Sequence, residues 1–248
     1  MLKKENVFEE VSNPTTEQVK KALMLHCFMI EKRDGRIKTR AVADGRSQFY
    51  TEDETYSPMV ELESIMLNAF IDVHEGRHFA TVDIKGAFLK AKVPEHLELI
   101  VKMNGNLAEM MNKLCPEFKI HSDGFMYMKC VKALNRHVEA ARLFYDDLNH
   151  SLTNTMGFVR NRYDPCVYNK CTEQRQVTIR THVDDLKISS RTEDQLNMTI
   201  DELRSIYQQI TVHEEKSHDY LGMIMMHDVK NQSIRIDMKK YKADVLMN

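Results

Sequence analysis

Apolar and polar residues alternate along residues 177–190, and the alternation predicts two short strands. Apolar residues or threonine occupy every second position from Val177 to Val183, and the alternation resumes after Asp184-Asp185. A period of two is typical of a strand with one covered face. Two such strands separated by an acidic pair predict a β-hairpin that carries both carboxylates at a tight, exposed turn. Aspartate is common in turns, so the pair by itself is more often a solvated turn than a functional site.

A third acid in a matching position changes this interpretation. Residues 79–84 also alternate, with Ala80, Val82 and Ile84 on one face and Asp83 on the other. One acid on a strand and two on a hairpin is the layout of a two-metal site for phosphoryl transfer. Mg²⁺ prefers hard oxygen ligands, and two ions about 4 Å apart can stabilise both the attacking and the leaving oxygen.

The rest of the pattern predicts helices interleaved with strands. Helices are expected over residues 15–23, 57–76, 107–114, 138–156 and 192–207. Strands are expected over residues 97–102, 125–131, 210–212, 220–226 and 233–237, and a hairpin over 27–42. An antiparallel sheet with helices on one face belongs to the α+β class, so this is the predicted fold class.

Local signals support the helix boundaries. Capping boxes are expected at Thr15 and Thr192, and Ser57-Pro58 is expected to begin the second helix. The apolar stripe of that helix is expected to face the core; its members are Leu62, Met66, Ala69, Phe70 and Val73.

Composition restricts the class of protein. The chain has 248 residues, enough for a sizeable core in one or two subdomains. Its formal net charge is −2, so any surface that binds nucleic acid must be local, and the densest basic patch lies at residues 32–40. The five cysteines contain no Cys-x-x-Cys pair, which supports neither a disulfide framework nor a zinc site. No apolar run is long enough to span a membrane.

Two acidic motifs resemble those of reverse transcriptases. They are Thr-Val-Asp-Ile-Lys-Gly-Ala-Phe-Leu at 81–89 and His-Val-Asp-Asp-Leu at 182–186. The resemblance is closest to the polymerases of copia-type LTR retrotransposons. Five further segments fall in the order of that family, at residues 37–48, 55–58, 132–134, 141–145 and 220–222.

The resemblance implies an architecture. It implies a polymerase palm, an antiparallel sheet backed by helices, with a fingers subdomain and a thumb that is largely missing. The expected boundaries are fingers at 1–78 with the basic hairpin at 27–42, palm at 79–104, fingers at 105–137, palm at 138–225, and palm end with the start of the thumb at 226–248. An intracellular protein is implied, in the cytoplasm, a virus-like particle or the nucleus. It would not be secreted, and it would have no membrane partner.

The resemblance also implies roles for individual residues. Asp83, Asp184 and Asp185 would be catalytic, and with the Ile84 carbonyl they would hold two Mg²⁺ ions, with Mn²⁺ as an alternative. Asp185 would tune the site more than ligate. The dNTP would be bound by Lys38, Arg40, Lys85, Gly86, Ala87, Phe88, Asn135 and Arg136. The primer strand, paired with an RNA or DNA template, would contact His182, Val183, Leu221 and Gly222.

Three departures from the family pattern leave alternatives open. Asn135-Arg136 stands where the family has an aromatic residue followed by glycine, His182 replaces a tyrosine, and Phe144 replaces a tryptophan. The leading hypothesis is an RNA-directed DNA polymerase fragment. The alternatives are a weak or inactive remnant that only binds nucleic acid, and an unrelated two-metal nuclease.

Overall fold

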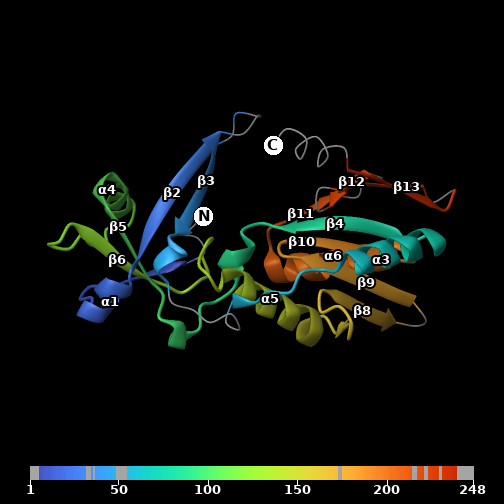
Figure 1. The fold of residues 1–248 in the computed structure, drawn as a ribbon, viewed down its shortest axis with the longest axis horizontal. Coiled ribbons are helices and arrows are strands. Elements are labelled where there is room, and N and C mark those ends of the chain that lie inside the picture. Colours follow the sequence, from blue (N-terminus) through green and yellow to red (C-terminus); the bar gives the residue numbers. More distant parts are fainter. Residues whose placement is uncertain are drawn as a thin grey trace. The chain divides into compact units, whose positions relative to one another are not determined.

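The structure is a computed structural model that describes residues 6–31, 35, 37–48, 55–172, 175–213, 217–220, 223–228 and 231–238 (Figure 1). The chain forms two units. The first comprises residues 1–57 and 86–147, and the second comprises residues 58–85 and 148–248. The chain therefore leaves the first unit after Ser57, returns to it at Gly86, and leaves it again after Asp147.

The first unit contains a five-stranded sheet with the strand order β1-β6-β5-β2-β3. Its strands are β1 (Phe8–Glu10), β2 (Leu23–Glu31), β3 (Ile37–Ala43), β5 (Ile100–Asn104) and β6 (Phe125–Cys130). β2 and β3 form the expected hairpin, paired from Leu25↔Ala43 to Glu31↔Ile37. Its helices are α1 (Thr16–Lys21) and α4 (Gly105–Leu114), with short 3-10 turns η1 (Gly45–Ser47), η2 (Ala87–Lys90) and η3 (Glu95–Leu97). The buried core is aliphatic and rich in methionine, and includes Val101, Met103, Met126 and Met128.

The second unit is built on a six-stranded antiparallel sheet with the strand order β11-β4-β10-β9-β8-β7. Its strands are β4 (His78–Ile84), β7 (Val159–Arg160), β8 (Val167–Thr172), β9 (Arg175–His182), β10 (Asp185–Ser190) and β11 (Ile210–His213). Ala80, Val82 and Ile84 are buried and alternate with half-buried Thr81 and Asp83, as the sequence predicts. A smaller sheet follows, made of β12 (Ser217–Tyr220), β13 (Met223–Asp228) and β14 (Ser233–Asp237).

Helices α3 (Leu62–His74) and α6 (Glu193–Tyr207) cover opposite faces of the six-stranded sheet. Arg180 of β9 donates to the Ile65 carbonyl of α3 at 3.3 Å. Ser190 of β10 donates to Gln195 of α6 at 3.2 Å. Arg180 is the cross-strand partner of Lys187 on β10, so these two side chains share a face of the sheet. Ser190 is three residues after Lys187 on β10, so its side chain is on the other face. The contacts to α3 and to α6 therefore lie on opposite faces. The α6 prediction is confirmed, because Leu196, Ile200, Leu203 and Tyr207 are all buried.

α5 (Ala140–His150) continues into a π-helical turn at Ser151–Thr155, in the region where the sequence predicts one long helix. The chain leaves this turn through Gly157, whose φ of 73° lies in the left-handed region that suits glycine. No helix among the residues described above is long and apolar enough to cross a membrane.

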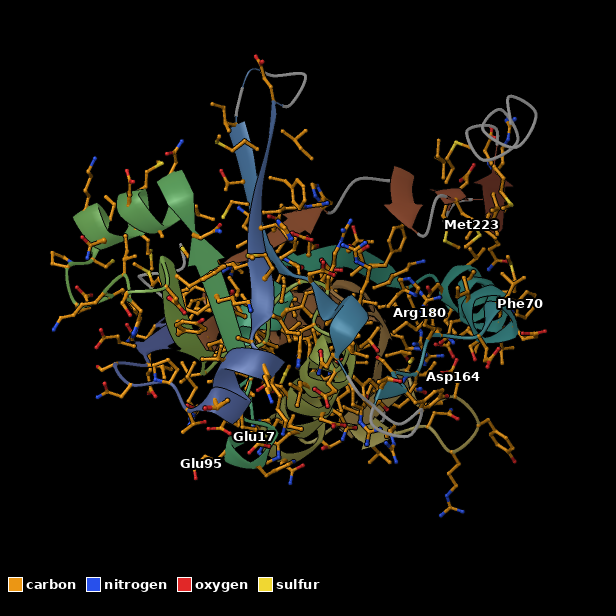
Figure 2. All side chains as sticks on the ribbon, turned by 60° about the vertical axis from the view of Figure 1, so that its left-hand side comes forward. Glu17, Phe70, Glu95, Asp164, Arg180 and Met223 are labelled. Carbon is orange, nitrogen blue, oxygen red and sulfur yellow. The ribbon has the colours of Figure 1, made fainter. Side chains whose placement is uncertain are left out.

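The predicted core face of α3 is wrong for three of its five residues. Leu62, Met66 and Phe70 are 56%, 38% and 65% exposed, and Figure 2 shows Phe70 on the outside of the helix. The buried face contains Ile65, Ala69, Asp72 and Val73 instead. A charged residue determines this orientation, because the carboxylate of Asp72 turns inwards to meet two cations of the sheet.

One helix start predicted from a capping residue is also wrong, and one predicted capping box does not form although its helix begins where expected. α3 begins at Leu62, and the Ser57 hydroxyl donates to the Ala141 carbonyl instead of capping that helix. Thr192 precedes α6 without a side-chain cap, since Gln195 accepts from Ser190 rather than closing a capping box. The box at Thr15 is confirmed, with the Thr15 side chain and Gln18 bonded reciprocally.

The two units do not follow the predicted subdomain boundaries. Residues 58–78 lie in the unit of the acidic strands, and β5 joins the other unit rather than the sheet that contains Asp83. β5 also begins three residues later than the predicted strand at 97–102. The assignment of the units to fingers and palm stays a prediction. The helix expected after Met238 lies outside the described residues.

Candidate active site

The acidic hairpin forms as the sequence predicts, with its corner one residue earlier. β9 ends at His182 and β10 begins at Asp185, and these two residues pair directly. Val183 and Asp184 are therefore the two central residues of the turn. Val183 has a φ of 54°, which a hairpin turn of type II′ requires at its first central position and which glycine adopts best. A β-branched residue in this region costs on the order of 1–3 kcal/mol, and such strain is typical of functional sites.

Asp83 lies beside this turn although it is distant in the sequence. β4 and β10 are neighbours, and Asp83 is the direct cross-strand partner of Asp185. The Ile84 amide donates to the Asp184 carbonyl at 3.1 Å, which holds the end of β4 against the turn. Directly opposed residues place their side chains on the same face, so Asp83 and Asp185 share a face of the sheet. Asp185 is exposed, whereas Asp83 and Asp184 are half-buried.

The acids at this sheet edge offer the donor set that Mg²⁺ uses. Within the described residues, no three or more His, Cys, Asp or Glu side chains are gathered closely enough to enclose an ion. Mg²⁺ does not need such a cage, because it binds through one or two carboxylates and completes its octahedron with water and substrate phosphates. The carboxylates of Asp83 and Asp184 and the adjacent carbonyl of Ile84 fit this requirement.

The segment that follows Asp83 leads from one unit into the other. Lys85 is exposed at the end of the second unit, and its amide donates to the Gln209 carbonyl at 3.0 Å. Gly86 begins the return to the first unit with a φ of 66°, a conformation that glycine adopts without strain. Ala87 is buried in η2, and Phe88 lies edge-on to Phe144 of α5 with ring centroids 6.2 Å apart.

In the first unit, the loop at Asn135-Arg136 is joined to the end of β3. Asn135 forms a parallel bridge with Val42, and its carbonyl accepts from the Ala43 amide at 3.2 Å. Arg136 has a φ of 66°, a left-handed conformation that glycine adopts without strain, and its side chain is exposed. A Cβ at Gly45 would lie 2.7 Å from the Arg136 carbonyl oxygen, so the two backbones approach closely enough to require a glycine at Gly45.

Replacing Arg136 with glycine should stabilise the protein, because the left-handed conformation costs a non-glycine residue about 1–2 kcal/mol. Part of this gain is offset by the greater freedom of glycine in the unfolded chain, so Tm should rise by about 2 °C. Thermal unfolding measures this. Arg136→Ala is the matched control, since it removes the same side chain but keeps the strain. An equal rise in both variants would contradict the argument.

A buried polar cluster next to this loop escaped the sequence analysis. His137 and Glu139 are both buried, with Nε2 and Oε2 2.9 Å apart. The Gln48 amide nitrogen lies 3.2 Å from the same Glu139 oxygen. The only sign of this cluster in the sequence is that His137 and Glu139 are two positions apart, directly before an apolar helix.

The basic hairpin places aromatic and basic residues on one face. Phe28 is the direct cross-strand partner of Arg40, so these two residues share a side of the β2–β3 ribbon. Arg40 is exposed. The Lys38 side chain, and the whole of residues 32–34 and 36, lie outside the described part of the chain.

The predicted primer-contacting residues are only partly described. His182 and Val183 are half-buried at the acidic turn, and the His182 Nδ1 atom is buried without a hydrogen-bond partner among the described residues. Leu221 and Gly222 lie outside the described residues.

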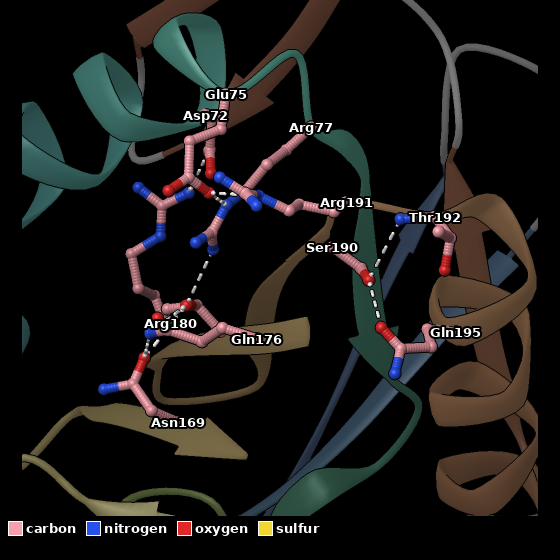
Figure 3. A network of polar contacts seen from close by, with 11 residues as sticks. Asp72, Glu75, Arg77, Asn169, Gln176, Arg180, Ser190, Arg191, Thr192 and Gln195 are labelled. Atoms are coloured by element: carbon pink, nitrogen blue, oxygen red, sulfur yellow. Dashed lines mark hydrogen bonds and ion pairs between the residues drawn. The ribbon is translucent and has the colours of Figure 1, made fainter. Parts of the chain in front are cut away.

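A second polar cluster that the sequence did not predict joins α3 to the acidic hairpin, and Figure 3 shows two of its members, Asp72 and Arg180. Asp72 of α3 is 1% exposed, and Arg180 and Lys187 of the hairpin are both 0% exposed. The Asp72 Oδ2 atom lies 3.1 Å from Arg180 Nη2 and 3.5 Å from Lys187 Nζ. The pKa of Lys187 is lowered to about 7, chiefly because burial disfavours the charged form; the Arg180 guanidinium also lowers it, and Asp72 acts in the opposite direction.

The chain is similar to known proteins. Residues 5–248 match the model of the family described as reverse transcriptase (RNA-dependent DNA polymerase). The chain is 28% identical over 191 residues to the retrovirus-related Pol polyprotein from transposon RE1 of Arabidopsis thaliana. That match covers 76% of this chain but 12% of the relative, so the chain spans a small part of the polyprotein.

The chain is also similar to solved structures. Telomerase from Candida tropicalis superimposes with a TM-score of 0.50 at 8% identity, covering 95% of this chain and 58% of that one. A foamy viral protease–reverse transcriptase in complex with double-stranded DNA gives a TM-score of 0.48 at 12% identity, covering 98% of this chain and 34% of that one. The predicted α+β class is confirmed, as is the resemblance to retrotransposon polymerases. With a family match that extends over almost its whole length, the chain belongs to the reverse transcriptase (RNA-dependent DNA polymerase) family.

Proposed function

We propose that this chain is the nucleotidyl-transfer part of an RNA-directed DNA polymerase, with its catalytic centre at Asp83 and Asp184. One observation carries the proposal. Asp83 is paired with Asp185, and the Ile84 amide donates to the Asp184 carbonyl, so acidic residues from two distant segments of the chain lie at one sheet edge.

The reaction extends a primer by one nucleotide. The primer 3′-hydroxyl loses its proton to solvent and its oxygen forms a bond to the α-phosphorus of a dNTP; the bond from that phosphorus to the bridging oxygen breaks, and pyrophosphate leaves with the electron pair. When bound, two divalent cations neutralise charge on the attacking and leaving oxygens. Asp83 and Asp184 would hold these ions through their carboxylate oxygens, and the Ile84 carbonyl would be a further ligand. Asp185, exposed and opposite Asp83, adjusts the charge of the site without closing the ligand shell.

The dNTP would be held by residues on several segments. The basic face of the β2–β3 hairpin supplies Lys38 and Arg40 for the triphosphate. The other contacts would come from Lys85, Gly86, Ala87, Phe88, Asn135 and Arg136. The strained, exposed Arg136 supports an altered nucleotide pocket, because it occupies a glycine position with a long cationic side chain.

Arg40→Ala should raise the KM for dNTP, since it removes a cation from the proposed triphosphate site. We expect about a tenfold increase from the loss of one charge-assisted hydrogen bond. Steady-state primer extension measures it. Arg46→Ala is the control in the same unit, because its guanidinium is already engaged by Asp44 at 2.7 Å. Equal effects of the two substitutions would remove Arg40 from the site.

Phe88→Ala should make the enzyme less selective against ribonucleotides, if the ring blocks a 2′-hydroxyl. The ring is half-buried against Phe144, so it also contributes to packing. The measured quantity is the ratio of kcat/KM for dNTP to that for the matching rNTP. Phe144→Leu loosens the same packing without altering the proposed gate, and should leave the ratio unchanged. A parent-like ratio in Phe88→Ala would leave Phe88 a packing residue.

The proposal is tested by primer extension on an RNA template with dNTPs and Mg²⁺. The expected product is a lengthened DNA strand that requires the divalent ion and is lost in Asp83→Asn. Shortened strands would indicate a nuclease instead. Tight binding of primer–template without extension would indicate a remnant that only binds nucleic acid. Neither result is compatible with the proposal.

A further inference from the structure

The hairpin that carries Asp184 and Asp185 contains an unfavourable feature two residues from its turn. Arg180 and Lys187 are direct cross-strand partners, and both side chains are fully buried. Directly opposed like charges destabilise a strand pair. The strands of the hairpin therefore repel each other at this pair unless an anion lies between the two cations.

Asp72 of α3 supplies that anion. A single carboxylate oxygen, Oδ2, contacts Arg180 at 3.1 Å and Lys187 at 3.5 Å. Arg180 also donates to the Ile65 carbonyl at 3.3 Å, so the guanidinium is fixed to the same helix twice. Lys187 lies over the ring of Phe79 on β4, 5.2 Å from its centroid. The cluster thus links α3 with three adjacent strands, including both strands that carry the acids.

The cluster of Asp72, Arg180 and Lys187 is close enough to the turn to affect the positions of its acids. The Arg180–Lys187 pair is two residues from the His182–Asp185 pair that closes the turn, or about 7 Å along the strands. Lys187 and Asp185 are on the same face, and so are Arg180 and His182. A change in the separation of Arg180 and Lys187 therefore displaces the carboxylates directly.

The end of α3 holds the other end of the hairpin through a separate contact. Glu75 pairs with Arg77 at 2.8 Å and with Arg191, just after β10, at 3.2 Å (Figure 3). Arg77 in turn donates to Thr178 of β9 at 3.0 Å. Glu75 is partly exposed and Asp72 is buried, so the two carboxylates form a natural pair for comparison.

We propose that Asp72 is a positioning residue for the candidate active site. By bridging Arg180 and Lys187 it holds the two strands of the hairpin together and against α3, and it thereby fixes Asp184 and Asp185 beside Asp83. Only the catalytic consequence rests on the proposed polymerase function; the mechanical one does not.

The test compares Asp72→Asn, which keeps the shape and removes the charge, with Glu75→Gln as the matched control. Amide hydrogen–deuterium exchange is measured at a temperature at which circular dichroism shows both variants folded. In Asp72→Asn, exchange in residues 180–187 should accelerate at least about tenfold, while α6 exchanges as in the parent. In Glu75→Gln, residues 180–187 should exchange at the parent rate. Unchanged exchange of the hairpin in Asp72→Asn would overturn the proposal.

The affinity for Mn²⁺, measured from the electron paramagnetic resonance signal of the free ion, shows whether a more mobile hairpin weakens the candidate active site. Asp72→Asn should bind Mn²⁺ at least about tenfold more weakly, and the double variant Asp72→Asn/Lys187→Met should recover part of the loss because one uncompensated cation is gone. Faster hairpin exchange with parent-like Mn²⁺ affinity would show a purely structural ion cluster and overturn the positioning role. Both measurements decide the question even for a chain that does not extend primers.

If the parent extends primers, Asp72→Asn should lower kcat and raise the Mg²⁺ concentration for half-maximal rate, with the KM for primer–template unchanged.

Asp72→Glu keeps the charge on a longer side chain and covers the case in which Asp72→Asn does not fold. It should fold and exchange faster than the parent between residues 180 and 187. Parent-like exchange and parent-like Mn²⁺ affinity in Asp72→Glu, together with a parent-like kcat, would contradict a role in positioning.

Discussion

Replacing Asp83 with asparagine should lower the rate of primer extension about a thousandfold while leaving the fold unchanged. The amide has the same shape as the carboxylate but carries no charge, so it cannot neutralise a bound cation. Charge stabilisation by such ions contributes several kcal/mol to the transition state, and about 4 kcal/mol corresponds to a factor of about a thousand. Asp83 is half-buried at the end of β4, where backbone pairing with β10 and β11 maintains the strand without its side chain.

Single-turnover extension of a DNA primer on an RNA template measures this effect without interference from product release. Circular dichroism establishes that the variant is folded. Asp201→Asn is the matched control, because Asp201 is an exposed acid of the same unit whose partner is Arg204 on the surface of α6. Its rate should equal that of the parent. A loss of less than tenfold in Asp83→Asn would exclude Asp83 as a ligand of the catalytic ions.

Replacing Lys187 with methionine should stabilise the protein at neutral pH by about 1–4 kcal/mol. The parent buries two cations, Arg180 and Lys187, against the single carboxylate of Asp72. Methionine has nearly the same length and leaves the Arg180–Asp72 pair balanced. The penalty of burying the second cation disappears, and the side chain keeps its contact with the ring of Phe79.

The gain should depend on pH in a defined direction. The pKa of Lys187 is lowered from 10.5 to about 7 in the folded protein. Between these two values the unfolded chain binds a proton that the folded protein does not, so the stability of the parent rises as the pH increases. The advantage of Lys187→Met is therefore complete below pH about 7 and shrinks towards pH about 10.5.

Urea unfolding of both proteins at pH 6.5 and pH 9.5, with a reductant present, tests both statements. Lys170→Met is the control, since Lys170 is partly exposed and paired with Glu202 at 3.6 Å; its effect should stay within about 0.5 kcal/mol at either pH. A gain from Lys187→Met that is the same at both pH values would mean that Lys187 is not deprotonated in the fold.

Local patterns predicted the elements that local forces determine. The acidic hairpin, the strand of Asp83 and the buried face of α6 follow from alternation or helical periodicity, and all three are present. The corner at Val183-Asp184 lies one residue from the expected position. Strand alternation does not define which residue takes the left-handed conformation, and Val183 gave no sign of it.

The errors arose where distant charges decide the packing. Arg180 and Lys187 alternate with apolar residues, a pattern that gives no sign that their side of the hairpin is buried. In the structure α3 covers that side, and Asp72 meets both cations. The same ion pairs explain why Phe70 is exposed, since a helix that turns Asp72 inwards must turn Phe70 outwards. A hydrophobic periodicity cannot identify a buried face that is chosen by a carboxylate.

The acidic part of the candidate site was predicted from the sequence, but the polar contacts around Arg136 were not. The meeting of Asp83 with the acidic turn followed from the resemblance and from strand-face geometry, and the register between β4 and β10 brings these residues together. The buried His137–Glu139 pair and the left-handed Arg136 depend on contacts with Gln48 and Gly45, which lie far away in the sequence. No pattern within a window of neighbouring residues contains that information.

The most direct measurement of the central claim is X-ray diffraction at the manganese absorption edge. Crystals of the chain would contain Mn²⁺, a primer–template and a dNTP analogue that cannot be hydrolysed. We expect two anomalous peaks about 4 Å apart, both in contact with the carboxylates of Asp83 and Asp184. Mn²⁺ peaks that contact other acids, or a single peak that touches only one of these two carboxylates, would contradict it.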